Sequence, residues 1–279
     1  MFVQNGTGVL KRVLLSPPTY LQPAPINEIA KKWEKLGMDP DIMAREFDAV
    51  VEAYHKAGVK TEFLEADKER PNSTFARDFG GCVKEGYILG NFKLPLRYKE
   101  HTDYKAKMEE LGIPCICEVK KGLFEGGDFA FLRPDLIALG MADRTNAEGV
   151  EEIKTTLRAL GYTVVGVPLK REYLHFDMCF NLVDENLAVT YYEGLPDDFK
   201  ALLKRLNIEI IPVEEGDIFL HGCNLQALGD HRVLSLARNT KVNEALKEHG
   251  MEVIELPVTE ILKAGGGPHC MTFPLEREL

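Results

Sequence analysis

Five residues that could do chemistry recur at nearly equal intervals along this chain. They are separated by 50, 49, 47 and 46 residues, and they are Asp78, Asp128, Asp177, Asn224 and Cys270. Such regular spacing indicates repeated structural units that deliver the same position to one place. Three carboxylates and a thiol delivered to one axis predict a reactive site and not a hydrophobic core.

Three further polar side chains lie within a few residues of this set: Glu125, His175 and His269. A thiolate is a nucleophile, and histidine can give or take a proton. Several carboxylates in a dry cavity are costly unless a cation compensates them. A hard metal ion would want more oxygen ligands and no thiol. A planar guanidinium, which pairs with carboxylates through two hydrogen bonds, fits this set better, so we expect no metal and no cofactor.

The elements that must position these residues also repeat. Five amphipathic helices are predicted near 40–57, 103–111, 147–160, 196–206 and 240–249. Four of these helices stop at a glycine, and the helix near 196–206 stops at Asn207, as expected for left-handed caps. Pro196 is expected in the first turn of its helix. A β-rich segment follows each stop, at 59–65, 113–119, 162–169, 208–213 and 251–258.

Hairpins are predicted after four of these strands, at 77–90, 127–140, 176–191 and 223–237. The fifth pair is split, so the segment 270–275 would have to pair with 9–16, which closes a ring and removes exposed sheet edges. The helix stops lie 54, 49, 46 and 43 residues apart. The sequence therefore predicts one domain, residues 1–279, folded as a five-bladed, pseudo-symmetric α/β propeller closed by its terminal strands.

Composition narrows the function further. The 279 residues are 45% hydrophobic and 28% charged with a net charge of −10, which is ordinary for a globular protein and argues against nucleic-acid or anionic-membrane partners. Lys11 and Arg12 interrupt the apolar start of the chain, so no signal peptide or membrane span is expected there. The six cysteines show no metal-binding spacing, and we expect reduced thiols in a cytoplasmic protein, with Cys115, Cys117 and Cys179 in the core.

Four ordered motifs resemble the guanidine-modifying superfamily. They are PNSTFARD at 71–78, FEGGD at 124–128, LHFD at 174–177 and GGGPHCMTFPL at 265–275. Members of that family include arginine deiminases, dimethylarginine dimethylaminohydrolases and amidinotransferases. The resemblance implies a five-bladed α/β propeller of the pentein type, which agrees with the repeat.

The resemblance also implies roles for five residues. Cys270 corresponds to the nucleophile that attacks the guanidinium carbon and forms a thiouronium intermediate. His175 corresponds to the general acid and later base, oriented by Glu125. Asp78 and Asp177 correspond to the pair that grips the guanidinium. The substrate cation is expected to lower the pKa of the thiol.

Further substrate-binding positions follow from the same motifs. Arg97 and Arg144 each lie 19 residues after Asp78 and Glu125, respectively. In the family, arginines at such positions clamp the α-carboxylate of a free amino acid. Asn72 and Phe75 resemble substrate-contacting residues, and the repeat adds Asp128 to the predicted binding set.

The resemblance favours unmethylated, free L-arginine as the substrate, because dimethylarginine hydrolases lack an acid equivalent to Asp177. The chain has no room for the helical insertion of plain deiminases, and is similar to compact dihydrolases that continue from citrulline to ornithine, with Asn72 suspected in the second hydrolysis. A dimethylarginine hydrolase, an amidinotransferase and a non-catalytic binding propeller stay open. A homo-oligomer is possible.

Two mobile or close-packed segments are expected beside the site. The proline-rich stretch from Ser16 to Pro25 is a candidate lid or an ordinary surface connection. The run from Gly265 to Gly267 would let backbone approach the site closely beside Cys270.

Overall fold

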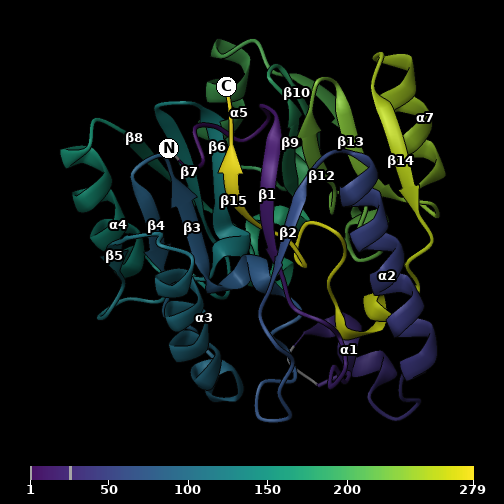
Figure 1. Ribbon diagram of the computed structural model, residues 1–279. Helices are drawn as coiled ribbons and strands as arrows, with labels where there is room; N and C mark the ends of the chain where they lie inside the picture. Colours follow the sequence, from purple (N-terminus) through teal and green to yellow (C-terminus); the bar gives the residue numbers. More distant parts are fainter. Residues whose placement is uncertain (1, 25–26) are drawn as a thin grey trace.

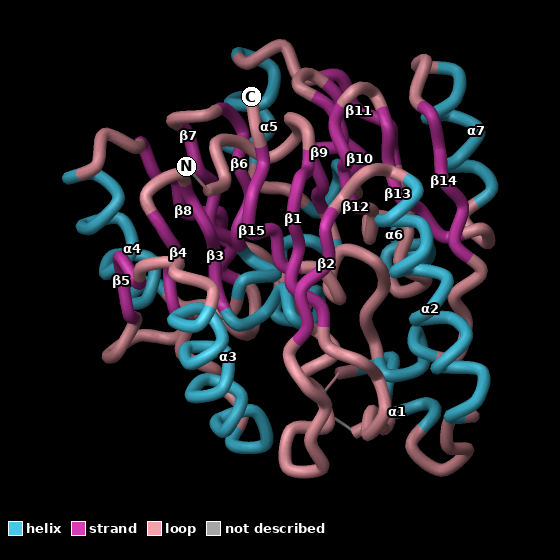
Figure 2. Tube along the Cα trace, viewed as in Figure 1, coloured by secondary structure: helices cyan, strands magenta, loops and turns pink. Residues whose placement is uncertain are grey.

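The computed structural model describes residues 2–24 and 27–279, and in these residues five three-stranded sheets form the blades of a propeller (Figures 1 and 2). The first sheet joins β15 (Phe273–Arg277), β1 (Leu10–Leu15) and β2 (Lys60–Phe63). The next two are β3 (Gly80–Val83), β4 (Gly86–Leu89) and β5 (Cys115–Glu118), then β6 (Phe129–Arg133), β7 (Leu136–Met141) and β8 (Thr163–Pro168). The last two are β9 (Phe180–Asp184), β10 (Leu187–Thr190) and β11 (Glu209–Pro212), then β12 (Gln226–Gly229), β13 (Arg232–Leu236) and β14 (Glu252–Leu256). The predicted five-bladed fold is confirmed.

Each blade is an antiparallel pair followed by a helix and a parallel third strand. The five crossover helices are α2 (Pro40–Lys56), α3 (Tyr98–Glu110), α4 (Ala147–Ala159), α5 (Asp197–Arg205) and α7 (Thr240–Glu248). The strand after a helix pairs with the hairpin before that helix, as β5 does with β4 and β8 does with β7. A parallel pair of strands needs a helical crossover between them, so the helix and the strand that follows it belong to the same blade as the preceding hairpin. The repeat predicted from the sequence, which is a helix, a strand and the next hairpin, therefore joins parts of two neighbouring blades.

The helix stops agree with the predicted caps. Gly58, Gly112, Gly161 and Gly250 have φ between 69° and 93°, and Asn207 has φ 53°. Two details differ from the prediction. Helix α3 begins at Tyr98, earlier than expected, and Pro196 is the extended N-cap of α5 and does not lie in its first turn.

The ring closes through the two ends of the chain. Strand β1 pairs antiparallel with β15, with Leu14 opposite Phe273 and Val13 opposite Pro274. A bridge joins Val3 to Arg277, so the termini lie close together (Figure 1). The predicted split hairpin is confirmed.

The core forms three clusters of buried apolar side chains. The cysteines are placed only partly as predicted, because Cys115 is exposed and Cys117 half-buried on the edge strand β5, whereas Cys179 is buried. Two short helices were not predicted, α1 (Glu28–Trp33) and α6 (Glu215–Ile218). In the part of the chain that the structure describes, no helix is long and apolar enough to span a membrane.

Candidate active site

Equivalent turns bring the spaced residues together. Short 3₁₀ turns precede the first strand of three blades, at Ala76–Phe79, Gly126–Asp128 and Phe176–Met178. Each turn carries one of the three aspartates of the repeat. Asn224 and Cys270 lie in the turns that precede β12 and β15. Because the blades are related by the pseudo-symmetry, these turns all face the centre of the ring.

A small inner cavity of about 30 Å³ lies at this centre and is lined by Phe75, Asp78, Arg97, Arg144, His175, Asp177, Asn224 and Cys270, among others. A larger outer cavity of about 340 Å³ adjoins it and shares Asn27, Ile29, Leu174, Met178 and Gly265 with it. The inner cavity is lined by the thiol and the carboxylates, and the outer one continues the space beside them.

Cys270 is almost fully buried, with 8% of its surface exposed. Its Sγ lies 2.9 Å from Asn224 Nδ2, which donates to it, and 3.5 Å from Asp177 Oδ2. Burial, together with the negative charges of Asp177 and Asp78, raises the pKa of the Cys270 thiol well above its usual range. A cation bound between these two carboxylates would oppose their contribution and lower the pKa of the thiol.

His175 and Glu125 form a buried pair. His175 Nε2 donates to Glu125 Oε2 at 3.0 Å, and Nδ1 lies 3.8 Å from Asp78 Oδ1. Burial alone would lower the pKa of His175, but the charge of Asp78 and the hydrogen bond to Glu125 raise it to about 10. Burial alone would raise the pKa of Glu125, yet His175 and Arg144 lower it to about 2. At neutral pH the pair is therefore an imidazolium and a carboxylate, with Nδ1 able to donate a proton.

Asp78 and Asp177 each have one oxygen held by the protein and one without a hydrogen-bond partner among the described residues. Asp78 Oδ2 accepts from Arg97 Nη1 at 2.5 Å, and Asp177 Oδ2 accepts from His269 Nδ1 at 2.8 Å. The two Oδ1 atoms are buried and unpartnered there. Buried acceptors of this kind are rare in native proteins. They mark where N–H groups of a ligand would bind.

Arg97 lines the inner cavity, but its guanidinium is already engaged. Besides Asp78, it donates to Glu100 through Nε and Nη2 and to the carbonyl oxygens of Asn72 and Phe75. This bonding disfavours the expected clamp on an α-carboxylate. The structure instead supports a positioning role, in which Arg97 holds Asp78.

Arg144 lies near the junction of the inner and outer cavities. Its Nη1 is 3.4 Å from Glu125 Oε2 and its Nε 3.2 Å from Asp143 Oδ2. Asp143 also accepts from Lys93 Nζ at 2.6 Å and Arg171 Nη2 at 3.0 Å. Arg144 also pairs with Glu125. Acidic and basic side chains both line the outer cavity, among them Glu28, Glu172, Lys31 and Arg171. This end therefore offers guanidinium groups that a carboxylate could bind, but it carries both signs of charge.

The other three predicted binding residues differ in their placement. Phe75 lines the inner cavity. Asn72 is buried but does not line it, and its Nδ2 has no partner in the described structure. Asp128 lines neither cavity, because its Oδ1 accepts the backbone N–H of Phe176 at 2.8 Å. Asp128 therefore supports the turn that carries His175 and is not placed to touch a substrate.

The glycine run approaches the site as predicted. A Cβ on Gly266 would lie 2.5 Å from the Phe75 ring and 3.0 Å from Cys270 Cβ, and one on Gly267 would lie 2.8 Å from Asn224 Oδ1. Only glycine allows backbone this close. Asn224, which the repeat singled out without a role, thus holds both the sulfur and the loop that carries it.

The proline-rich stretch predicted as a candidate lid or an ordinary surface connection lies outside both cavities where the structure describes it. None of residues 16–24 lines either cavity, and Pro25 is outside the described residues. Asn27 and Ile29, at the start of α1, line both cavities. Asn27 Nδ2 donates to the carbonyl of Ala264 at 3.1 Å, which ties α1 to the glycine run. No sequence pattern singled out this segment.

Asp78, Glu125 and His175 could in principle hold a metal ion, since their ligand atoms lie within 4.8 Å of one another. Arg97 and Arg144 already neutralise the two carboxylates. A divalent cation would have to displace these contacts, so the arrangement suits an organic cation better.

The fold and the site together define a guanidine-modifying hydrolase that acts on C–N bonds of linear amidines. The sequence model of the family described as "N,N dimethylarginine dimethylhydrolase, eukaryotic" matches residues 18–277, and the chain belongs to this family. The resemblance seen in the motifs is confirmed, and the binding-propeller alternative is not supported.

Curated relatives differ in length and description. The uncharacterized protein YkgA of Bacillus subtilis is 30% identical over 97% of this chain and 93% of its own length. An arginine deiminase of Bacillus cereus is 26% identical over 75% of this chain but only 62% of its own length. The chain therefore spans less than two thirds of this deiminase.

Solved structures with the same fold include the N-terminal domain of ArgZ, described as an arginine dihydrolase from Cyanobacteria. It superposes with a TM-score of 0.85 at 24% identity, covering 94% of this chain and 96% of that domain. A dimethylarginine dimethylaminohydrolase superposes with a TM-score of 0.79 at 20% identity, covering 95% of this chain and all of that one. These likenesses show the fold.

Proposed function

We propose that this enzyme hydrolyses free L-arginine at its guanidinium carbon through a covalent intermediate on Cys270. The observation that carries the proposal is the pair of unpartnered buried oxygens, Asp78 Oδ1 and Asp177 Oδ1, in the cavity that holds the Cys270 sulfur. A planar guanidinium between them would satisfy both and compensate their charge.

Substrate binding would create the nucleophile. Burial and the field of Asp177 and Asp78 keep the Cys270 thiol protonated in the free enzyme. The substrate cation offsets that field and favours the thiolate, so the thiol loses its proton to solvent. The sulfur then bonds to the guanidinium carbon. Imidazolium Nδ1 of His175 gives its proton to a terminal nitrogen, the C–N bond breaks, and ammonia leaves behind a thiouronium ester.

The second half-reaction would use the same groups in reverse. His175 is now neutral and accepts a proton from water, while the hydroxide oxygen bonds to the thiouronium carbon. As the C–S bond breaks, the hydroxyl proton of the tetrahedral carbon passes to the departing sulfur, so citrulline forms and the Cys270 thiol of the free enzyme is restored. Glu125 stabilises the imidazolium in both steps through the bond to Nε2.

The amino-acid end of the substrate would lie in the outer cavity. We assign the α-carboxylate to the guanidinium groups of Arg144, which lines the inner cavity, and of Arg171, which lines the outer one. A peptide-bound arginine has no α-carboxylate to place there, so the free amino acid is favoured.

A continued reaction to ornithine would need a second water to attack citrulline and release carbamic acid, which yields carbon dioxide and ammonia. The similarity to the ArgZ domain supports this extension. The buried Asn72 amide, with no described partner for Nδ2, is our candidate for enabling it. The family match instead favours a dimethylarginine substrate, which would yield dimethylamine. Against it, a methylated nitrogen could not donate two hydrogen bonds to Asp177.

Mass-spectrometric product analysis with arginine, citrulline and dimethylarginine as separate substrates tests the proposal. Citrulline from arginine supports a deiminase and ornithine a dihydrolase, whereas dimethylamine would replace the proposed substrate. Turnover only with an added amine acceptor would indicate an amidinotransferase.

The variant Cys270→Ser should abolish turnover, because the hydroxyl is a far weaker nucleophile, while its melting temperature stays near that of the wild type. Cys115→Ser, at an exposed cysteine, is the matched control and should retain full activity. Activity in Cys270→Ser near that of the control would overturn the covalent route. The possible homo-oligomer stays a prediction, checked by the mass in solution.

A further inference from the structure

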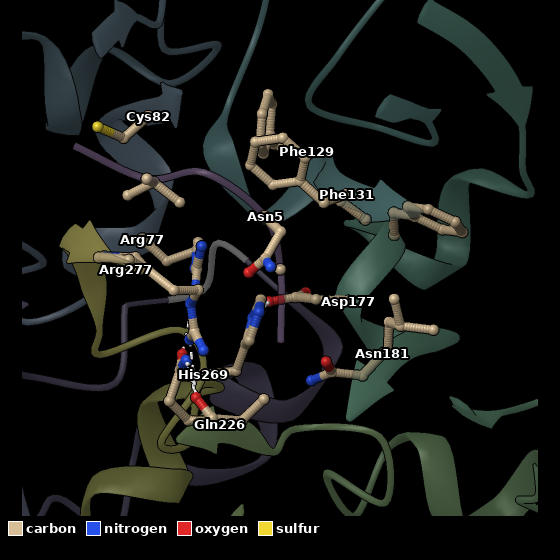
Figure 3. A pocket seen from close by; sticks show the side chains of 18 of the residues that line it. Asn5, Arg77, Cys82, Phe129, Phe131, Asp177, Asn181, Gln226, His269 and Arg277 are labelled. Atoms are coloured by element: carbon tan, nitrogen blue, oxygen red, sulfur yellow. Dashed lines mark hydrogen bonds and ion pairs between the residues drawn. The ribbon is translucent and has the colours of Figure 1, made fainter. Parts of the chain in front are cut away.

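A second cavity, of about 60 Å³, meets the inner cavity at Asp177, and we call it the rear cavity (Figure 3 shows residues that line it). Among the described lining residues, Asp177 is the one that both it and the inner cavity share. Residues adjacent in the sequence line different cavities. Asp78 and Cys270 line the inner cavity, whereas Arg77 and His269 line the rear one. The centre of the ring is thus divided into two chambers.

Two buried arginines from different blades reach into the rear cavity, as Figure 3 shows for Arg77 and Arg277. Arg77 precedes β3 and is 8% exposed, and Arg277 ends β15 and is 1% exposed. Their described acceptors are all neutral. Arg77 Nη2 donates to Gln226 Oε1 at 3.0 Å, and Arg277 donates to the carbonyl oxygens of Gly8 and Ala227.

No carboxylate within 4 Å pairs with either guanidinium in the described structure. Asp177, the carboxylate that lines both cavities, accepts a hydrogen bond at Oδ2 from His269 Nδ1 at 2.8 Å. Arg77 Nε is buried with no described partner. The two cations also repel each other, and burial together with Arg77 lowers the pKa of Arg277 to about 9. It is still charged at neutral pH.

Two guanidinium charges against one carboxylate leave the rear cavity with an excess positive charge. Because the two guanidinium groups are buried, water hydrates them poorly, and an uncompensated buried charge is strongly unfavourable. Phe129 and Phe131 make part of the wall apolar (Figure 3). The volume of about 60 Å³ is large enough for a small ion, since about 10–15 Å³ on this measure already holds one water molecule.

We propose that the rear cavity binds a small inorganic anion of halide size, held by Arg77 and Arg277. The anion would accept from Arg77 Nε and lie between the two guanidinium groups. It supplies the charge that the described residues of this cavity lack.

The position of Arg77 links this site to the other chamber. Its backbone N–H donates to the carbonyl of Cys270 at 3.0 Å, and its charge acts on Asp177. An anion attracts Arg77 and weakens its hold on Asp177, which leaves that carboxylate freer for a cation in the inner cavity. Linkage requires the reverse as well, so a bound cation tightens the anion. This coupling rests on the proposed function, whereas the anion site does not.

Bromide is the probe for the site. Crystals grown or soaked in bromide should show an anomalous peak between Arg77 and Arg277, and bromide should raise the melting temperature relative to gluconate, which is too large to enter, at equal ionic strength. Arg277→Met should lose both effects. Arg232→Met removes an arginine that donates to the Ala57 carbonyl outside this cavity, and should keep both.

If Arg277→Met does not fold, Ala130→Leu takes its place, because Ala130 lines the cavity and a larger side chain fills it while both charges remain. It too should abolish the bromide effects. No peak in the wild type, or equal bromide effects in the wild type and the filled variant, would overturn the site.

The coupling is measured on the wild-type enzyme. Replacing gluconate by bromide should lower the KM for arginine about five-fold, a typical size for coupled sites. A peak with an unchanged KM would overturn the coupling alone. A peak without turnover of any guanidino compound would overturn the proposed function and leave the anion site standing.

Discussion

At the scale of single residues, the candidate site sets its charges through burial and neighbours. His175 has its pKa raised to about 10 and Glu125 has its pKa lowered to about 2, although burial opposes both changes. Burial and two carboxylates together keep Cys270 protonated. The acid is thus ready in the free enzyme, while the nucleophile awaits a cationic substrate, which protects the thiol from other reactions.

The buried pair predicts how stability depends on pH. The lowered pKa of Glu125 contributes stability above pH 4.5 that is lost as pH falls toward 2. The raised pKa of His175 contributes stability below pH 6.5 that is lost as pH rises toward 10. In Glu125→Gln the pH dependence of the free energy of unfolding should be smaller on both the acid and the alkaline side, because the titrating carboxylate is gone and the imidazolium loses a partner. Urea unfolding between pH 2 and pH 10 measures this free energy.

The control for that series is Glu248→Gln, at an exposed position on α7. It should reproduce the wild-type curve. If Glu125→Gln showed unchanged acid and alkaline limbs, the pair would not be ionised as described.

At the scale of elements, α2 holds the loop that carries Cys270. The buried carboxylate of Glu46 accepts the backbone N–H groups of Thr259, Glu260 and Ile261. In return, Glu260 Oε2 accepts the N–H of Asp39, the N-cap of α2. A helix of one blade and the turn that leads to the candidate nucleophile are therefore fixed to each other.

Glu46→Gln should destabilise this connection. A glutamine amide would direct donors at backbone N–H groups, and hydrogen bonds to a charged acceptor contribute about 2 kcal/mol. We expect about 2 kcal/mol less unfolding free energy in chemical denaturation, together with lower kcat. Glu52→Gln, exposed on the same helix, is the matched control. Equal stability of the two variants would contradict the role of Glu46.

The glycine run makes a second prediction at this scale. Gly266→Ala places a methyl group against the Phe75 ring and Cys270 Cβ, so the loop must shift. Activity should fall at least about ten-fold, since small misplacements near reacting groups are costly. Gly216→Ala, where a Cβ meets nothing within 4 Å, should leave the rate unchanged. Steady-state rates decide, and a fully active Gly266→Ala would show that the close approach is not needed.

At the scale of the whole molecule, the split blade makes the ring depend on both ends of the chain. Strand β15 pairs with β1, and Arg277 donates to the carbonyl oxygens of Gly8, just before β1, and of Ala227 in β12. Four blades are closed by local hairpins, whereas this one is closed by the most distant pairing in the sequence. Such a contact forms late and carries a large loop-closure cost.

Circular permutation should therefore be tolerated. A flexible linker between residues 279 and 1, with new ends between Leu36 and Gly37, makes β15 and β1 an ordinary hairpin. Leu36 is 73% exposed, so the new ends disturb little. We expect activity to persist and the melting temperature to stay within about 5 °C of the wild type. Loss of folding in the permutant would contradict this account of closure, and a chain lacking 273–279 should fail to fold.

The sequence by itself determined the ring, its closing pair and the residues brought to the centre. Helix stops, hairpin turns and the spacing from Asp78 to Cys270 are local patterns, and repeated local patterns need no knowledge of distant contacts. Only the tertiary structure decided which acceptors each centre-facing residue meets. In the folded chain, Arg97 donates to Asp78 and Glu100, and Asp128 accepts from the backbone N–H of Phe176. Arg77 lines the rear cavity, whereas its neighbour Asp78 lines the inner one. The reason is physical: a side chain's partners depend on blades far apart in sequence, and buried charges take whichever partner lies within hydrogen-bond reach.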